Sequence, residues 1–424
     1  MKILLISANT EKINMPTLPM GLGFVAAAVK RKGYDVRFLD LMEAENPKKR
    51  LAESLGEFPP DMIGISIRNV DDQCSENPRF LLKEAGEIVR ICKNLSSAPT
   101  VLGGAGYSLF PTAALDFLEA DMGIQGEGEK IFTELADRIS AGKTLSDIPG
   151  LYIRGKGLQA PRTYIRRPEQ WPFPDPELFD AGRFQNPAYY LPFQTRRGCP
   201  MQCSYCATSV IEGKLIRKRP VFSVLKELRR WREAGFSRIF FTDNTFNLPP
   251  SYAMQLCEAL ISEGLNLEWR CILYPGKISR DLARKMAGAG CKEAALGFES
   301  GNTAVLRGMN KRFGPEDIRE SSDILADAGI GRWGFLLLGG PDENRDSVRE
   351  SLEFADSLNA EAMKVTVGLR IYPHTRLADT AGSQGMTESE ADLLSPRFYI
   401  KAGMEEWLRK TAAEWIQNRP GWSA

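Results

Sequence analysis

Two series of short apolar segments, each alternating with amphipathic segments, run through the 424-residue chain. Segments that are apolar throughout and are separated by helices indicate parallel strands that helices cover on both faces. In the first half, the expected strands are residues 2–7, 36–40, 62–67, 100–104 and 122–126. A helix is expected over 21–32, with Gly33 just beyond its end, where glycine is common. Residues 1–150 are therefore predicted to form a doubly wound, Rossmann-like α/β domain.

A second series of β/α units follows a proline-rich stretch. Residues 151–190 are expected to form an ordered connector, because 166–180 holds four prolines together with apolar aromatic residues. The expected strands beyond it are 192–197, 238–241, 267–272, 293–298, 332–338 and 364–370. In the helix near 221–234, the residues predicted to face the core are Val221, Leu225, Leu228 and Trp231. Six units, fewer than the eight of a closed barrel, predict a partial (β/α)6 barrel over 191–375 and a short helical tail over 376–424.

The chain contains a single histidine, His374, and this excludes several kinds of chemistry. A Ser-His-Asp triad, a multi-histidine zinc site or a two-histidine iron site would have to be built from it alone. There is no G-x-x-x-x-G-K-[ST] loop, so a nucleotide triphosphatase is not expected. The 55 Lys and Arg residues balance 54 Asp and Glu residues, so the chain as a whole does not attract nucleic acid or an anionic membrane.

No apolar run reaches the roughly 18 residues that span a bilayer. The N-terminal MKILLIS lacks a signal-peptide cleavage site and is interpreted as a strand. A cytoplasmic protein is therefore expected, and in that reducing compartment clustered cysteines indicate metal ligands.

Three cysteines lie directly after the first strand of the second series, in the segment RRGCPMQCSYCATS. Cys199, Cys203 and Cys206 have the spacing C-x3-C-x2-C. Three thiolates in one loop can hold three irons of a [4Fe–4S] cluster and leave the fourth iron open. A structural zinc site would need a fourth ligand, which no nearby cysteine or histidine supplies. The other five cysteines are scattered and are expected to fill the core as small apolar residues: Cys74, Cys92, Cys257, Cys271 and Cys291.

At this motif the sequence resembles the radical S-adenosylmethionine (SAM) superfamily. The segments RIFFTDNTFN (238–247), LGFESG (296–301), WGFLLLGGPDEN (333–344) and LRIYPHT (369–375) resemble later barrel segments of that family, in the same order. The resemblance implies that Cys199, Cys203 and Cys206 hold the cluster. It also implies a set of SAM-binding residues, namely Tyr205, Asp243, Asn244, Thr245, Glu299, Ser300 and Gly339.

Two further residues have alternative interpretations. Arg270, on the third strand of this series, is a candidate partner for the SAM carboxylate, since a guanidinium binds a carboxylate through two hydrogen bonds. The alternative is a structural ion pair. His374 is a candidate acid or base on the substrate side. The alternative is a loop histidine tied to the backbone.

The N-terminal half resembles the cobalamin (B12)-binding domain that precedes the radical SAM barrel in one subgroup. The matching pieces begin at residues 19, 61, 101, 123 and 148. Residues 1–373 contain no histidine, so a D-x-H-x-x-G loop with a lower cobalt ligand is absent. The resemblance places cobalamin along the loops after the strands, where the candidates are Ser66, Arg68, Asn69, Gly103, Gly104, Ala105, Gly106, Tyr107, Gly126, Glu127 and Glu129.

The resemblance implies a [4Fe–4S] enzyme that cleaves SAM to a 5′-deoxyadenosyl radical and uses cobalamin to methylate an unactivated carbon. One alternative is a non-methylating rearrangement or cyclisation. An alternative of another class is a non-catalytic iron–sulfur sensor. The substrate is expected to be a small molecule, lipid or peptide rather than a nucleic acid. A flavodoxin or ferredoxin is expected as the external electron donor.

Overall fold

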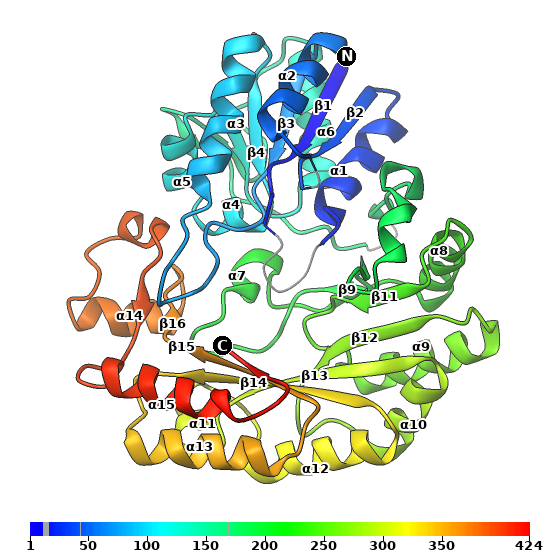
Figure 1. Ribbon diagram of the computed structural model, residues 1–424. Coiled ribbons are helices and arrows are strands. Elements are labelled where there is room, and N and C mark those ends of the chain that lie inside the picture. The colour runs from blue at the N-terminus through cyan, green and yellow to red at the C-terminus, as the bar shows by residue number, and fades with distance from the viewer. Residues whose placement is uncertain (12–16, 43, 168–169) are drawn as a thin grey trace. The chain divides into compact units, whose positions relative to one another are not determined.

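The computed structural model describes residues 1–11, 17–42, 44–167 and 170–424. The chain divides into two units (Figure 1). The first unit contains residues 1–189 with 210–213 and 387–396, and the second contains 190–209, 214–386 and 397–424. Residues 151–189, expected as a connector, thus fall within the first unit.

The first unit is built on a mostly parallel sheet. Its parallel strands are β1 (Lys2–Ser7), β2 (Asp35–Asp40), β3 (Met62–Ser66), β4 (Thr100–Gly103) and β5 (Met122–Ile124). They lie in the order β2-β1-β3-β4-β5, so the chain reverses its direction of travel across the sheet between β1 and β3. Two antiparallel strands, β6 (Leu151–Ile153) and β7 (Gly157–Leu158), extend the β5 edge. Ligands of such sheets bind at the carboxyl ends of the strands beside the reversal.

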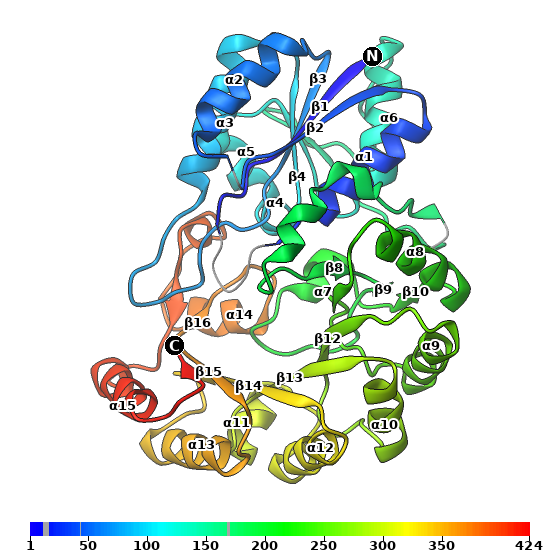
Figure 2. The same cartoon turned by 45° about the vertical axis from the view of Figure 1, so that its right-hand side comes forward.

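Helices cover both faces of this sheet, as predicted for strands such as β1, in which Ile3 to Ile6 are all inaccessible to solvent. Figure 2 shows α1 (Met20–Arg31) and α6 (Gly128–Ser140) on one face, with α2 (Pro47–Glu57), α3 (Leu82–Leu95) and α5 (Pro111–Leu118) on the other. The short α4 (Ala105–Leu109) follows β4. Gly33 follows α1 with a positive φ of 84°, which confirms its predicted place at the helix end.

The proline-rich stretch is ordered where the structure describes it. It contains two short 3-10 helices, Pro176–Leu178 and Ala181–Gln185. Trp171 is buried, and the ring of Phe179 packs edge-on against Phe38 of β2. Pro168 and Glu169 lie outside the described residues. The aromatic residues therefore pack the stretch against the first unit.

The second unit contains a parallel sheet of seven strands, counted over the described residues. In spatial order they are β8 (Leu191–Phe193), β11 (Arg238–Phe241), β12 (Glu268–Leu273), β13 (Cys291–Glu299), β14 (Gly331–Leu338), β15 (Ala362–Val367) and β18 (Trp422–Ser423). The intervening helices are α8 (Val221–Glu233), α9 (Pro250–Glu263), α10 (Arg280–Gly288), α11 (Thr303–Gly308), α12 (Pro315–Asp327) and α13 (Arg345–Ser357). Figures 1 and 2 show α9, α10, α12 and α13 along one face of the sheet.

Burial alternates along these strands, as it does in an incomplete barrel with helices on its outer side only. In β12, Trp269, Cys271 and Leu273 are buried, while Arg270 and Ile272 on the other face are half-buried. The α/β class and the parallel sheet are thus as predicted. One detail of α8 differs. Val221, at its first turn, is only half-buried, and Val224 takes the predicted core place beside Leu225, Leu228 and Trp231.

The strand ends and the C-terminal tail also differ from expectation. The first predicted strand, 192–197, is broken into β8 and β9 (Arg196–Arg197), and β9 pairs with β10 (Arg217–Lys218). The end of the last predicted strand forms a separate β16 (Leu369–Arg370), which pairs with β17 (Phe398–Tyr399). The tail contains α14 (Arg376–Ser383) and α15 (Glu405–Gln417) as predicted, and in addition β18 joins the main sheet beside β15.

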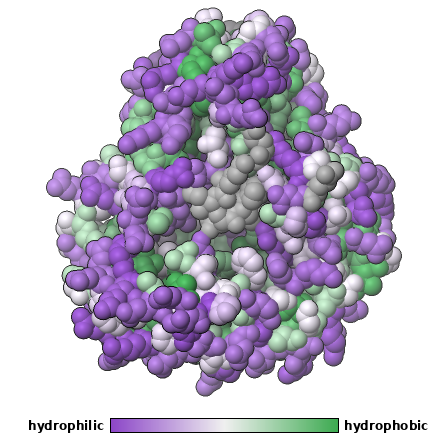
Figure 3. Space-filling model, in the orientation of Figure 1, coloured by the Kyte–Doolittle hydropathy of each residue, from purple (hydrophilic) through white to green (hydrophobic). Residues whose placement is uncertain are grey.

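Hydrophilic residues cover most of the face shown in Figure 3. Over the described ranges, no helix is both long enough and apolar enough to cross a membrane.

Candidate functional site

The three predicted cluster ligands lie in one loop between β9 and α7 (Thr208–Glu212). Cys199 is buried, Cys203 and Cys206 are half-buried, and none of the three forms a disulfide. Backbone bonds fix the loop to distant segments, because Ser204 N donates to Met309 O over 3.0 Å and Leu377 N donates to Ser204 O over 2.9 Å. The Asn310 amide donates to Gln202 O over 2.6 Å. The loop is therefore held in place by residues directly after α11 and by the first turn of α14.

The three cysteines could in principle bind either a single metal ion or an iron–sulfur cluster. Among the described residues, no group of three or more His, Cys, Asp or Glu side chains is placed to hold one ion. Structural zinc draws four ligands around a single centre, whereas an iron–sulfur cube binds each thiolate at a separate corner. Three cysteines in one loop therefore fit a cluster with one open iron.

Asp243, predicted to bind SAM, is completely buried and engaged by the chain itself. Its carboxylate accepts hydrogen bonds from Thr195 N at 2.7 Å, Thr195 Oγ1 at 2.5 Å and Arg196 N at 3.0 Å. It also accepts one from Arg196 Nε at 3.1 Å. These bonds join the end of β11 to the segment that leads into the cysteine loop. The structure thus gives Asp243 a supporting place beneath that loop.

Glu299, at the end of β13, lies beside the cysteine loop. Its Oε1 accepts a hydrogen bond from the Tyr205 hydroxyl at 2.9 Å and is 3.2 Å from Nζ of Lys311. Burial and the charge of Glu299 raise the pKa of the Tyr205 phenol well above its usual value. Burial raises the pKa of the Cys203 thiol as well, against the positive charge of Lys311. Tyr205 and Glu299 are therefore brought together with the cysteines, and Lys311 joins them.

Lys311 was not among the residues identified from the sequence. It lies in the loop between α11 and α12, and only the turn of the chain through α11 returns it to Glu299. Burial acts to lower its pKa, but the negative charges of Glu299 and the cysteines outweigh burial, and the pKa is raised. A single lysine in a polar loop has no sequence pattern that could have identified it.

The remaining SAM candidates differ in their surroundings. Ser300 is buried and its hydroxyl lies 2.8 Å from that of Ser351 in α13. Asn244 is half-buried and Thr245 buried in the loop after β11. Arg270 lies 3.8 Å from Glu293 and stacks 3.9 Å from the ring centre of Tyr190, which is the arrangement of the structural alternative.

The last two candidates are Gly339, directly after β14, and the single histidine, His374. Gly339 has a φ of 104°, and its N–H donates to the buried carboxylate of Glu343, as does that of Gly340 at 2.6 Å. His374 is exposed with a φ of 60°, directly before Thr375, the N-cap of α14. Glu343 was not predicted from the sequence, although it lies within the segment WGFLLLGGPDEN (333–344).

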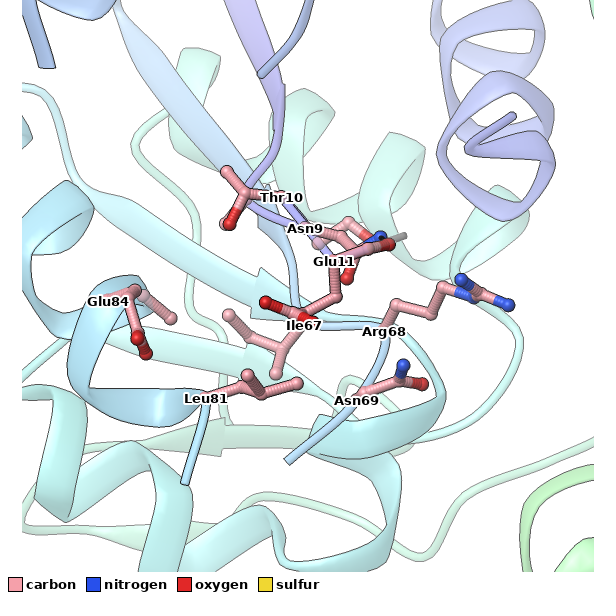
Figure 4. A pocket seen from close by; sticks show the side chains of 11 residues that line it. Asn9, Thr10, Glu11, Ile67, Arg68, Asn69, Leu81 and Glu84 are labelled. Atoms are coloured by element: carbon pink, nitrogen blue, oxygen red, sulfur yellow. Dashed lines mark hydrogen bonds between the residues drawn. The ribbon is translucent and has the colours of Figure 1, made fainter. Parts of the chain in front are cut away.

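In the first unit, the candidates after β3 lie at the edge of a small pocket (Figure 4). The pocket has a volume of about 20 Å³ and is lined from the ends of β1 and β3 and from α3. A cavity of this volume has no room for a corrin ring. Figure 4 shows the Arg68 side chain extending away from Leu81 and Glu84. Arg68 is exposed, and within the described ranges no hydrogen bond or ion pair engages its guanidinium.

Of the three glycines at the end of β4 and directly after it, two pack closely against the neighbouring loop and one does not. A Cβ on Gly104, whose φ is 98°, would lie 2.5 Å from Ile67 O, and one on Gly106 would lie 3.0 Å from Arg68 O. These two glycines let the loops after β3 and β4 pack together, through Gly106 N bonds to Ile67 O and Arg68 O. A Cβ on Gly103 would meet nothing within 4 Å, so Gly103 leaves its surroundings open to a ligand.

The other cobalamin candidates are engaged within the first unit. Tyr107 is inaccessible to solvent, and its side chain packs against Gly123, where an added Cβ would lie 2.1 Å from the hydroxyl. Ala105 begins α4. Gly126 N donates to Ser108 Oγ over 2.9 Å, and Glu127 accepts a hydrogen bond from Ile165 N at 2.6 Å. Glu129 is buried in α6.

Comparisons with known proteins agree with this division. Residues 6–136 match the model of the B12 binding domain, and residues 194–355 match that of the radical SAM superfamily. An uncharacterized methyltransferase of Pyrococcus horikoshii is 28% identical over 396 residues, which cover 90% of this chain and 83% of the relative. A tryptophan 2-C-methyltransferase of Streptomyces laurentii is 22% identical, over 89% of this chain and 74% of the relative.

The fold is also found in a solved structure. The radical S-adenosylmethionine methyltransferase TsrM of Kitasatospora setae, with tryptophan and a SAM analogue bound, superposes with a TM-score of 0.87. The match covers 99% of this chain and 89% of TsrM at 23% identity. The superposition shows that the two proteins share one fold. The two family models and their order show that this chain carries a B12-binding domain followed by a radical SAM superfamily domain.

Proposed function

We propose that the protein is a cobalamin-dependent radical SAM enzyme that methylates an unactivated carbon of a small molecule. The observation that supports this most strongly is the cysteine loop, where three cysteines outside any disulfide share a loop with Tyr205, and Tyr205 donates a hydrogen bond to Glu299. Three thiolates in one loop are a donor set suited to an open-iron cluster. Two residues at the carboxyl ends of the strands in the first unit also support cobalamin binding. Gly103 has open space around the position of a Cβ, and the Arg68 side chain is exposed. The relatives named as methyltransferases support methyl transfer.

When bound, the cluster and SAM supply a carbon-centred radical and the cobalamin carries the methyl group. Cys199, Cys203 and Cys206 would hold the cluster. Asp243 keeps the segment before Cys199 in place through four hydrogen bonds. Glu299 and Ser300 would contact SAM at the carboxyl end of β13, and Gly339 would contact it at the end of β14. In the first unit, Arg68, Gly103 and Gly126 would lie along the cobalamin.

The substrate and the electron donor are part of the same proposal. A small molecule is the class proposed, and one relative is named for tryptophan. A one-electron donor protein of the flavodoxin or ferredoxin type would reduce the cluster. The balanced charge of the chain favours neither nucleic acid nor an anionic surface as a partner.

The test is anaerobic preparation of the full chain with hydroxocobalamin, iron and sulfide. We expect about four irons per chain, a bound corrinoid spectrum, and 5′-deoxyadenosine formed from SAM under reduction. Replacing Cys199, Cys203 and Cys206 together by serine should abolish iron binding and SAM cleavage, whereas Cys74→Ser, at an exposed cysteine outside the loop, should leave both unchanged. Bound zinc, or a cluster that does not react with SAM, would refute the proposal. SAM cleavage without a bound corrinoid would favour the non-methylating alternative.

A further inference from the structure

Lys311 is a buried cation beside the cysteine loop that the proposed function leaves unused. Its side chain is 5% exposed. The ammonium lies 3.2 Å from Oε1 of Glu299 and donates to Gly297 O over 3.0 Å. It also lies 5.4 Å from the ring centre of Tyr205, which directly precedes Cys206. All of these residues belong to the second unit.

A buried ammonium is costly unless negative charge surrounds it. Glu299, whose side chain is 10% exposed, forms an ion pair with Lys311 and supplies one negative charge to balance the ammonium. The Tyr205 hydroxyl donates to the same Glu299 oxygen, so the carboxylate is shared between the phenol and the ammonium. Tyr205, whose ring lies 5.4 Å from the ammonium, belongs to the cysteine loop itself. The cation is therefore held between the Glu299 carboxylate and the ring of a cysteine-loop residue.

A cluster held by three thiolates is negatively charged, and its reduction adds a further negative charge. A nearby cation stabilises the reduced form, because Coulomb interactions are strong where water is excluded. A nearby anion acts in the opposite direction. Lys311 and Glu299 therefore have opposite effects on the reduction of a cluster in this loop.

We propose that Lys311 is a positioning residue that facilitates reduction of the cluster, with Glu299 fixing its ammonium beside Tyr205. The step is a one-electron transfer, in which the donor loses one electron and the cluster gains it, without proton transfer. This inference rests on the proposed function, since it requires the cluster. Its direct consequence concerns the midpoint potential of the cluster and not the activity of the enzyme.

The experiment compares the wild-type chain with Lys311→Met, Lys311→Arg and Glu299→Gln after anaerobic reconstitution, without SAM. The midpoint potential is measured by redox titration followed by electron paramagnetic resonance. We expect Lys311→Met to reduce the ratio of reduced to oxidised cluster about tenfold at a fixed potential, equivalent to a shift of about 59 mV to lower potential. Lys311→Arg should restore the wild-type value, and Glu299→Gln should shift it upward.

The control is Lys292→Met, at an exposed lysine of β13, which removes the same charge away from the loop. An unchanged potential in Lys311→Met, or an equal shift in Lys292→Met, would refute the inference. If Lys311→Met does not assemble a cluster, the inference is tested by the midpoint potential of Glu299→Gln. A potential equal to that of the wild type would then refute the inference. A wild-type chain without a SAM-reactive cluster would instead refute the proposed function, so the two failures are distinguishable.

Discussion

The side chains of Arg196 and Asp243 form an ion pair that solvent does not reach, with Nε 3.1 Å from Oδ2. The other side of the guanidinium donates through Nη1 to the carbonyls of Phe246 and Leu248, at 2.9 and 2.8 Å. The pair therefore links the segment before the cysteine loop to the segment after β11. Cys199 follows Arg196 by three residues, so the placement of the first cysteine depends on this link.

Asp243→Asn should destabilise the second unit. The substitution leaves the Arg196 guanidinium buried without its counter-ion, which typically costs about 3–5 kcal/mol. We expect a lower free energy of unfolding in urea and less iron bound after reconstitution. Asp327→Asn is the matched control, because its carboxylate is 62% exposed in a surface ion pair. Equal stability of the two variants would show that the buried pair does not support the loop.

Gly104→Ala and Gly103→Ala are neighbouring substitutions with opposite expectations. In Gly104→Ala the new Cβ meets Ile67 O at 2.5 Å and the backbone keeps a φ of 98°, so we expect a loss of about 2 kcal/mol or more in stability. Gly103→Ala meets no atom and should leave stability unchanged while weakening cobalamin binding. Thermal unfolding and hydroxocobalamin titration measure the two effects. Tight cobalamin binding by Gly103→Ala would place the ligand elsewhere.

Arg68→Ala should weaken cobalamin binding without affecting folding. The side chain is exposed and no described residue engages its guanidinium, so its removal should change stability by less than about 0.5 kcal/mol. Cobalamin carries amides and a phosphodiester that such a guanidinium can bind, and we expect about a tenfold loss of affinity. Absorbance titration with hydroxocobalamin measures it. Arg90→Ala, at an exposed arginine of α3, should bind normally. A similar loss in both variants would point to a general charge effect.

Glu343 should make stability depend on pH. Burial raises the pKa of Glu343 to about 7, against an ordinary value of 4.5, and one of its oxygens has no partner in the described part of the chain. Between these pH values the folded chain binds a proton that the unfolded chain releases, so stability falls as pH rises, by up to about 3 kcal/mol in total.

In Glu343→Gln this contribution is absent, so the difference in unfolding free energy between the variant and the wild type should grow from pH 5 to pH 8 in favour of the variant. Urea unfolding at several pH values measures the difference. Glu320→Gln, at an exposed position of α12, should show no such trend. Parallel pH profiles for Glu343→Gln and the wild type would show that the carboxyl group does not titrate in this range.

The sequence by itself determined the α/β class, most strand and helix positions and the cysteine motif, because these follow from local periodicity and spacing. It did not determine which residue of α8 packs inward at the first turn, where Val224 replaces Val221. It also missed β18, since a strand of two residues has no pattern of its own.

Only the tertiary structure decided the partners within the site. Asp243 and Thr195 are 48 residues apart, and Tyr205 and Glu299 are 94 apart, yet the fold brings each pair into hydrogen-bond contact. The same folding carries Lys311 back to Glu299 and separates the packed Gly104 from the open Gly103. Such contacts depend on the whole sheet, because burial and neighbouring charge at a residue are set by segments distant in the chain.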